Sequence, residues 1–171
     1  MWIRLPALLT FFLALTAASA FAQSSDQRPA PAIEFLAGYA GFVDDATIDH
    51  AIYGAAGRVY LTPRLAVGPE LVYMVGPDSD RDLFLTGNVT FDLLPPQQGR
   101  PRRVTPFIVG GGGFFQHSDR FGSFSSTSYE GAFTAGGGVR GWITERVYAL
   151  ADFRIGWELH SRVNGGIGIG F

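Results

Sequence analysis

The chain contains no cysteine and no lysine among its 171 residues. Without cysteine there can be no disulfide, no thiol chemistry and no cysteine-ligated metal ion. All 13 basic residues are arginine, and 15 acidic residues outnumber them. This surplus of negative charge argues against a nucleic-acid partner, and we expect none.

Long apolar runs are also scarce, and the first 22 residues hold the main one. Arg4 precedes an apolar run from Leu5 to Leu15, and Ala20-Phe21-Ala22 fits the A-x-A pattern of a secretory cleavage site. We therefore predict a signal peptide over residues 1–22 and a mature chain that begins at Gln23. The alternative is an uncleaved anchor, which the shortness of the apolar run disfavours.

The remaining residues suit a single domain. Residues 23–32 contain two prolines and are predicted to form a flexible lead-in to a domain over residues 33–171. Aromatic residues make up 14% of the chain, and 23 residues are glycine. Both features favour a strand-rich fold in which backbones approach closely.

From residue 33 onward apolar residues recur with a period of two, and no segment keeps helical spacing. This pattern predicts eight strands of mostly ten to fifteen residues, longer than is usual in soluble sheets and long enough to cross a bilayer. The expected strands are Ile33–Val43, Ala51–Leu61, Leu65–Val75, Asp82–Leu93, Val104–Gln116, Tyr129–Ile143, Val147–Glu158 and Arg162–Phe171. The predicted fold class is all-β, an eight-stranded antiparallel up-and-down transmembrane β-barrel.

The connections support this topology because short and long ones alternate. Thr62-Pro63-Arg64 and Thr144-Glu145-Arg146 are tight, whereas residues 44–50, 76–81 and 117–128 form longer polar connections. In outer-membrane barrels the short turns face the periplasm. Residues 94–103 break the alternation, and their prolines indicate an extended periplasmic turn.

The charges fall on one face of each predicted strand. In the seventh strand Asp152, Arg154 and Glu158 share a face, whereas the opposite face is apolar from Val147 to Trp157. Because a charge in contact with lipid is costly, the charged face is assigned to the barrel interior. The predicted interior polar set is Glu34, Arg58, Glu70, Asp92, Glu130, Arg140, Asp152, Arg154 and Glu158.

Outward aromatic residues gather near the strand ends and are expected to form two bands around an aliphatic belt, as in outer-membrane barrels. The residues assigned to this girdle are Phe35, Tyr39, Tyr53, Tyr73, Phe91, Phe107, Phe115, Tyr129 and Trp157. In the fifth strand this assignment directs Gly110 and Gly112 inward.

The last strand ends in an alternating Gly/Ile run and a terminal aromatic residue. Asn164, Gly166, Ile169 and Phe171 match the polar-x-Gly-x-x-apolar-x-aromatic assembly signal of outer-membrane barrels, with Ile169 where an aromatic residue is common. The sequence resembles the small eight-stranded outer-membrane barrels, which include OmpA-type transmembrane domains and OmpX-like proteins. The resemblance implies an integral protein of a Gram-negative-type outer membrane, with a periplasmic N-terminus.

These observations predict a barrel with a filled polar interior and a structural or surface-interaction role. The expected partners are outer-membrane lipid, lipopolysaccharide and, during biogenesis, the barrel-assembly machinery, and the protein is expected to be a monomer. We expect no cofactor, no metal site and no catalytic residue. A narrow channel and a soluble ligand-binding barrel are the non-enzymatic alternatives.

Enzymatic activity is the remaining alternative. His117-Ser118 resembles the His-x-Ser stretch of outer-membrane lipid A deacylases, but adjacent residues of a strand point to opposite faces. Asp78, Asp80 and Asp82 have the spacing that begins a calcium loop, but Leu83 replaces its glycine and Val89 its bidentate glutamate. Neither stretch therefore predicts a working site.

Overall fold

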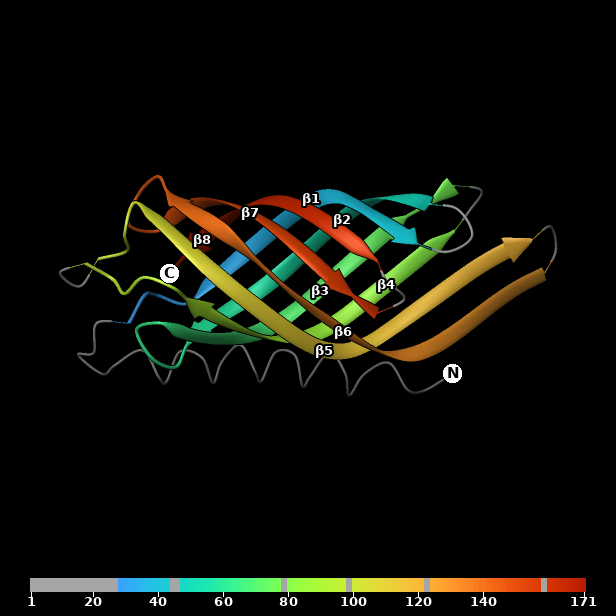
Figure 1. Cartoon of the computed structure of the whole chain (residues 1–171), viewed down its shortest axis with the longest axis horizontal. Coiled ribbons are helices and arrows are strands. Elements are labelled where there is room, and N and C mark those ends of the chain that lie inside the picture. Colours follow the sequence, from blue (N-terminus) through green and yellow to red (C-terminus); the bar gives the residue numbers. More distant parts are fainter. Residues whose placement is uncertain (1–27, 44–46, 78–79, 98–99, 122–123, 158–159) are drawn as a thin grey trace.

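The computed structural model describes residues 28–43, 47–77, 80–97, 100–121, 124–157 and 160–171. Eight strands follow one another in chain order around a closed barrel, each antiparallel to its neighbours (Figure 1). They are β1 (Ala32–Val43), β2 (Thr47–Tyr60), β3 (Leu65–Val75), β4 (Arg81–Asp92), β5 (Val104–Phe121), β6 (Phe124–Trp142), β7 (Val147–Gly156) and β8 (Ser161–Gly170). The predicted eight-stranded antiparallel up-and-down barrel is confirmed.

The predicted signal peptide lies outside the described residues, as does the lead-in before Arg28. None of the residues that the structure describes forms a helix with the length and hydrophobicity that a membrane span requires.

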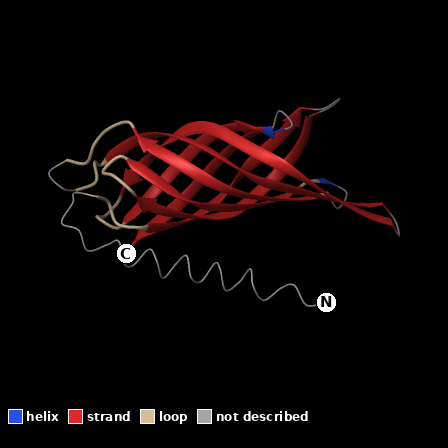
Figure 2. Ribbon diagram, turned by 90° about the horizontal axis from the view of Figure 1, so that it is seen from below, coloured by secondary structure: helices blue, strands red, loops and turns tan. Residues whose placement is uncertain are grey.

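The first and last strands close the barrel. β1 pairs with β8 from Ala32 opposite Gly170 to Gly41 opposite Ser161, and the amide of Phe171 donates to the carbonyl oxygen of Pro31 over 3.0 Å. The start of β1 and the end of β8 therefore lie at one end of the barrel, which we call the terminal end. The opposite end, where β5 and β6 project, is the hairpin end (Figures 1 and 2).

Two tight turns at the terminal end are stabilised in the same way, by a threonine hydroxyl that accepts backbone hydrogen bonds. The hydroxyl oxygen of Thr62 accepts from the backbone amides of Arg64 and Leu65 over 3.3 and 2.9 Å. The hydroxyl oxygen of Thr144 accepts from the equivalent amides two and three residues later over 3.2 and 2.9 Å. Each threonine thus satisfies backbone donors that the ladder leaves unpaired at the strand ends.

The long connection after β4 also lies at the terminal end. It contains a small bridge in which Gln97 and Arg100 exchange backbone hydrogen bonds of 2.9 and 3.0 Å. Arg102 Nε donates to the carbonyl oxygen of Pro95 over 2.8 Å, so the two limbs of the connection are tied together.

The connection between β5 and β6 differs from the sequence prediction. Residues 117–128 were expected to form a polar loop, but β5 continues to Phe121 and β6 starts at Phe124. β4 accompanies β5 only to Ser118, and β7 joins β6 only from Thr134, so the tip of the hairpin stands clear of the barrel (Figure 1). Two paired strands can form all the backbone hydrogen bonds between them without an apolar face. Hydrophobic alternation in the sequence therefore does not predict this extension.

Burial alternates along the strands as the period of two requires. β7 has buried even-numbered residues from Tyr148 to Arg154, whereas Ala149, Ala151, Phe153 and Ile155 are exposed. Among the described residues, the exposed charged side chains all belong to the connections or to the two ends of the barrel: Asp49, Arg100, Arg103, Glu130, Glu145 and Arg146. The wall between the ends is apolar outside and charged inside, the reverse of a soluble barrel.

The face assignment of β5 was wrong. Phe107 and Phe115, predicted to lie in the outer girdle, are 2% and 3% exposed and point inward. The neighbouring Ile108 and Phe114 occupy the outer face instead. The glycines between them carry no side chain that reveals a face, and adjacent Phe114 and Phe115 put an aromatic ring on both sides, so the sequence pattern was ambiguous here.

Candidate functional site: the filled interior and the mouth at the hairpin end

Two ion pairs fill the interior near the terminal end. Arg58 of β2 donates to both carboxylate oxygens of Glu34 on β1, over 3.0 and 2.8 Å, and the Tyr148 hydroxyl of β7 donates to Glu34 Oε1 over 2.6 Å. Two strands on one side of the lumen and one strand beyond the β1–β8 seam are thereby joined. A bidentate pair of this kind is stronger and more directional than a single charge-assisted hydrogen bond.

The second pair links β4 to β6. Arg140 Nη2 donates to Asp92 Oδ1 over 2.6 Å, and its Nη1 donates to the Tyr60 hydroxyl over 2.5 Å. Tyr60 in turn donates to Asp92 Oδ2 over 2.9 Å. The guanidinium carbon of Arg140 lies 4.5 Å from the centre of the inward-facing Phe107 ring, close enough for a cation–π contact.

A group of five side chains, which we call the middle cluster, follows toward the hairpin end. Glu70 lies between Arg154, whose Nη2 is 2.9 Å from Glu70 Oε2, and Arg162, which donates to Glu70 Oε1. Arg154 also donates to Asp152 Oδ2 over 2.8 Å, and Asn164 Nδ2 donates to Asp152 Oδ1 over 2.6 Å. All five side chains are buried.

Charge is balanced across these three groups. Arg58, Arg140, Arg154 and Arg162 meet Glu34, Glu70, Asp92 and Asp152, so each guanidinium has a carboxylate partner. Seven of these eight residues belong to the predicted interior set, and Arg162 does not. The signal was available, because Arg162 shares the face of Asn164 and Gly166 in the alternation of β8.

The remaining predicted interior residues lie elsewhere. Glu130 is exposed, because β6 at this point belongs to the hairpin and has left the barrel wall, and its carboxylate accepts from Trp157 Nε1 over 3.0 Å. Glu158 lies outside the described residues.

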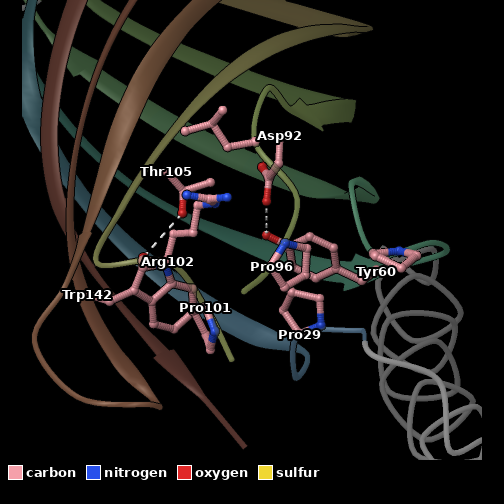
Figure 3. A pocket seen from close by; sticks show the side chains of 10 residues that line it. Pro29, Tyr60, Asp92, Pro96, Pro101, Arg102, Thr105 and Trp142 are labelled. Atoms are coloured by element: carbon pink, nitrogen blue, oxygen red, sulfur yellow. Dashed lines mark hydrogen bonds between the residues drawn. The ribbon is translucent and has the colours of Figure 1, made fainter. Parts of the chain in front are cut away.

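At the terminal end a small opening lies between the long connection and the barrel. The pocket there is lined by residues that include Tyr60, Asp92, Arg102, Thr105 and Trp142 (Figure 3). Its volume is about 10 Å³, close to the space that one water molecule needs. The hydrogen bond between Tyr60 and Asp92 forms its inner wall, so the pocket stops at the buried ion pair.

An aromatic layer separates the middle cluster from the hairpin end. The rings of Phe84 and Phe115 are 4.5 Å apart, and Phe42 lies 6.4 Å from Phe115. His160 packs against Phe42 and Phe84, with ring centres 5.3 and 5.0 Å away. The layer also includes Ile52, Val72 and Met74, all at most 1% exposed. The lumen is therefore filled at this level by apolar side chains.

His160 completes this layer. Its Nδ1 donates to the carbonyl oxygen of Trp157 over 2.5 Å, and its Nε2 is buried with no hydrogen-bond partner among the described residues. Burial lowers the pKa of His160 below its usual value of 6.5, and the nearby positive charge of Arg162 lowers it further.

Four side chains at the hairpin end form what we call the mouth cluster: His50, Asp80, Asp82 and His117. His50 Nε2 lies 2.8 Å from Asp80 Oδ2 and 3.4 Å from Asp82 Oδ2. His117 Nδ1 lies 2.6 Å from Asp82 Oδ1 and 3.6 Å from Asp80 Oδ1. The side chains of His50 and Asp82 are each 2% exposed, whereas those of Asp80 and His117 reach solvent at 17% and 36%.

The sequence pattern does not connect His50, His117 and the aspartates. In the ladders Ile52 lies opposite Met74, Met74 opposite Asp82 and Asp82 opposite His117, so the register of β2, β3, β4 and β5 brings the mouth cluster together. Their proximity depends on a barrel closure that spacing along the chain does not reveal.

His117 and Ser118, which resemble the His-x-Ser stretch of lipid A deacylases, point apart. Ser118 Oγ accepts from Gln116 Nε2 over 3.3 Å, on the face opposite His117. His117 instead contacts Asp82 and packs against Phe115 at 6.1 Å between ring centres. The expectation that adjacent strand residues diverge holds for this pair.

Except for Phe107 and Phe115 of β5, which point inward, the residues assigned to the aromatic girdle lie on the outer face. Phe35, Tyr39, Tyr53, Tyr73, Tyr129 and Trp157 are exposed, and Phe91 is partly exposed under the guanidinium of Arg64, whose central carbon is 4.4 Å from the ring centre. Phe114 and Phe133 add two exposed rings that the sequence analysis did not include. Phe133 and Trp157 meet edge to face at 6.0 Å between ring centres.

The four residues of the predicted assembly signal occupy the seam strand. Asn164 is buried, Ile169 and Phe171 are exposed, and Gly166 faces β1 so closely that a Cβ there would overlap the carbonyl oxygen of Phe35. The signal thus combines an interior hydrogen bond, a close backbone approach and two outward apolar side chains.

No protein-family model and no curated protein sequence matches the chain. Solved structures do match in fold. The N-terminal β-barrel domain of Pseudomonas aeruginosa OprF aligns with a TM-score of 0.68 at 14% identity, covering 84% of this chain and 98% of that domain. Neisserial surface protein A aligns with a TM-score of 0.72 at 11% identity, covering 82% and 97%. Ail, the attachment invasion locus protein of Yersinia pestis, aligns with a TM-score of 0.53 at 12% identity, covering 83% and 97%. The fold is that of the small eight-stranded outer-membrane barrels.

Proposed function

We propose that this chain is an integral outer-membrane barrel whose interior is closed to solutes and whose role is structural or surface contact. The proposal is supported by the likeness to small outer-membrane barrels and by the wall itself. Side chains such as Leu71, Leu85, Phe153 and Ile167 are about half exposed on the outside, where a soluble barrel carries polar residues. Lipid is the solvent that suits this surface.

The proposed orientation puts the terminal end in the periplasm. Tight threonine turns join strands at that end, and the longest projection leaves the opposite end (Figure 2). Outer-membrane barrels have short periplasmic turns and longer outer loops, and export by the predicted signal peptide would start the chain in the periplasm.

The observation that carries the closed state is the stack of side chains through the lumen. The ion pairs of Glu34 and Asp92, the middle cluster around Glu70 and the aromatic layer around Phe84 succeed one another from end to end. A barrel of about eight strands is only wide enough to be filled in this way. A solute or hydrated ion would have to break buried ion pairs in order to pass.

Conductance in planar lipid bilayers tests the closed state. We expect the purified, refolded chain to give no discrete steps under voltage and salt conditions in which a wide porin, as a positive control, conducts. Regular single-channel steps from the wild-type chain would refute the proposal. The same sample should be heat-modifiable on gels, because otherwise silence would reflect an unfolded barrel.

The β5–β6 hairpin is the part of the molecule best suited to surface contact. It extends past the last residues that β4 and β7 pair with, and along Phe124–Phe133 the ladder between β6 and β7 is absent. Ail, a fold neighbour, is named for attachment and invasion, and a projecting outer segment is consistent with such a role. The contact proposed here is with a neighbouring surface or protein outside the cell.

Catalysis is not part of the proposal. The hydroxyl of Ser118 lies on the opposite face from His117, so a base and a nucleophile do not meet there. Mass spectrometry of lipid A from cells that express the wild-type chain, or the His117→Gln and His160→Gln variants, checks this. We expect the same lipid A in all three and in cells without the protein; a lipid species that depends on either histidine would restore the hydrolase alternative.

A further inference from the structure

The mouth cluster gathers donor atoms from four places in the fold. His50 belongs to β2, Asp80 to the connection before β4, Asp82 to β4 and His117 to β5. His50, Asp80 and Asp82 each offer one ligand atom, and these atoms all lie within 4.8 Å of one another. We propose that the mouth cluster binds one divalent transition-metal ion of the zinc type, with His117 as a fourth ligand.

The separations suit such an ion. Ligand atoms that are each about 2.0–2.1 Å from a tetrahedral zinc ion are about 3.3 Å from one another. The four histidine-to-carboxylate distances in the cluster range from 2.6 to 3.6 Å, and His50 Nε2 to Asp82 Oδ2 is 3.4 Å. Changes of less than about 1 Å would bring each of these four pairs to the separation of zinc ligands.

The charge of the cluster also suits a divalent cation. The two carboxylates of Asp80 and Asp82 lie together in a place where the side chains of His50 and Asp82 are almost wholly buried. Buried carboxylates need a compensating charge, which a divalent ion would supply in full. One oxygen, Asp80 Oδ1, is buried without a hydrogen-bond partner among the described residues, so a lone pair is available for a metal.

Shape and surroundings give the site walls and an entrance. A Cβ at Gly76 would clash with His50 Nε2 and lie 2.9 Å from Asp80 Oδ2, so glycine leaves the donor atoms their space. Phe42 packs edge-on against His50, with ring centres 5.0 Å apart, and Phe115 lies under His117. The floor is therefore apolar, whereas the partly exposed Asp80 and His117 open the site to the outer end.

The donor set selects the class of ion. Two imidazole nitrogens with two carboxylates favour zinc and its first-row neighbours, whereas calcium takes six to eight oxygen ligands. The proposal differs from a calcium loop of the Asp78-x-Asp80-x-Asp82 type, because two of the four ligands are histidines from other strands.

Isothermal titration of the chelator-treated, refolded full-length chain with Zn²⁺ tests the site. We expect about one ion bound per chain at micromolar concentration, and an affinity at least about tenfold lower in the Asp82→Asn and His117→Gln variants. His160→Gln is the control. His160 is as buried as Asp82 and lies near the same end, but it contacts Trp157 and the aromatic layer instead of the mouth cluster. That variant should bind like the wild type.

Three results would overturn the proposal. They are the absence of saturable Zn²⁺ binding, equal weakening by His160→Gln, and displacement of Zn²⁺ by an equal concentration of Ca²⁺. Gel heat modifiability before titration identifies any variant that has not folded, and the more exposed His117 variant keeps the test available if Asp82→Asn fails to fold. The test does not depend on the conductance experiment, so each proposal can fail alone.

Discussion

Arg140 of β6 and Asp92 of β4 share a buried ion pair, 2.6 Å between Nη2 and Oδ1, although β5 lies between their strands in the sheet. The pair therefore spans β5 on the inner side of the wall instead of following the ladder. Contacts of this kind depend on the curvature of the wall, which brings inward side chains of next-but-one strands together.

Breaking that pair should be costly. In Asp92→Asn, Arg140 keeps its charge in a fully buried place without a carboxylate, so we expect the free energy of unfolding to fall by about 3–5 kcal/mol. Urea titration of the barrel in lipid vesicles measures the change. The double variant Asp92→Asn/Arg140→Met should recover part of the loss, because it removes the orphaned charge.

An exposed pair of the same chemistry serves as the control. Arg100 Nε and Glu145 Oε1 are 3.3 Å apart, but their side chains are 76% and 69% exposed. Glu145→Gln should change the free energy of unfolding by less than about 1 kcal/mol. Equal losses in Asp92→Asn and Glu145→Gln would mean that the interior pair does not hold the barrel.

The seam should be sensitive to a single methyl group. A Cβ at Gly38 would overlap the carbonyl oxygen of Val163 on β8, so Gly38→Ala should lower the free energy of unfolding by about 1–3 kcal/mol. At Gly141 a Cβ would meet nothing within 4 Å, and Gly141→Ala should be neutral or slightly stabilising. If the two variants unfold at the same urea concentration, the seam is not tightly packed.

The terminal aromatic residue should matter for assembly more than for hydrophobic burial. Phe171 is 63% exposed and Phe114 is 68% exposed, so Phe171→Ala and Phe114→Ala remove similar rings. Only Phe171 occupies the last position of the assembly signal. We expect a several-fold lower yield of heat-modifiable protein in the outer-membrane fraction for Phe171→Ala alone, and equal yields would remove the special role of the last residue.

His160 should make the barrel less stable as the pH falls. Its pKa is below 6.5 in the folded state, because burial and Arg162 disfavour its charged form, so below pH 6.5 the unfolded chain binds the extra proton. Stability is then lost as the pH decreases from 6.5 toward the folded-state pKa. His160→Gln lacks this contribution.

Urea midpoints at pH 7.5 and pH 5.5 measure the effect of His160. The wild-type chain should lose more stability between the two values than His160→Gln does. An identical pH dependence in both would show that this imidazole titrates alike in the folded and unfolded chains.

The projecting hairpin should be dispensable for folding. Replacing residues 119–126 by Asn-Gly would join Ser118 to Thr127, which are already opposite each other in the ladder, through a two-residue turn. Because the described residues of this segment, 119–121 and 124–126, pair with one another and not with β4 or β7, we expect the unfolding midpoint in vesicles to stay within experimental error of the wild type. A trimmed chain that no longer folds would give the hairpin a structural role in place of a contact role.

The fold was predictable because its signal repeats in every strand. Alternation assigned Glu34, Glu70 and Asp152 to the inside without knowledge of their partners, since one lipid-facing charge would be costly. The prediction was wrong where apolar and polar side chains do not alternate along the strand. The glycine run before Phe114 hid the phase of β5, and paired polar strands hid the hairpin beyond Gln116.

The site was less predictable than the fold. Arg162 could have been assigned from its phase with Asn164, but no local pattern joins His50 to Asp82 and His117. Their meeting depends on the relative shift of three strands, which hydrophobic period does not encode. The inward-facing Phe107 likewise contacts the guanidinium of Arg140, which belongs to another strand.

Because all the basic residues in the lumen are arginine, acid and alkali affect its ion pairs differently. Four guanidinium groups neutralise four carboxylates there, so the stack as a whole carries no net charge on which a membrane potential could pull. Arginine does not release its proton in proteins, whereas lysine can do so when buried. The guanidinium groups therefore keep their charge in alkaline surroundings, whereas acid strong enough to protonate the carboxylates would break the ion pairs.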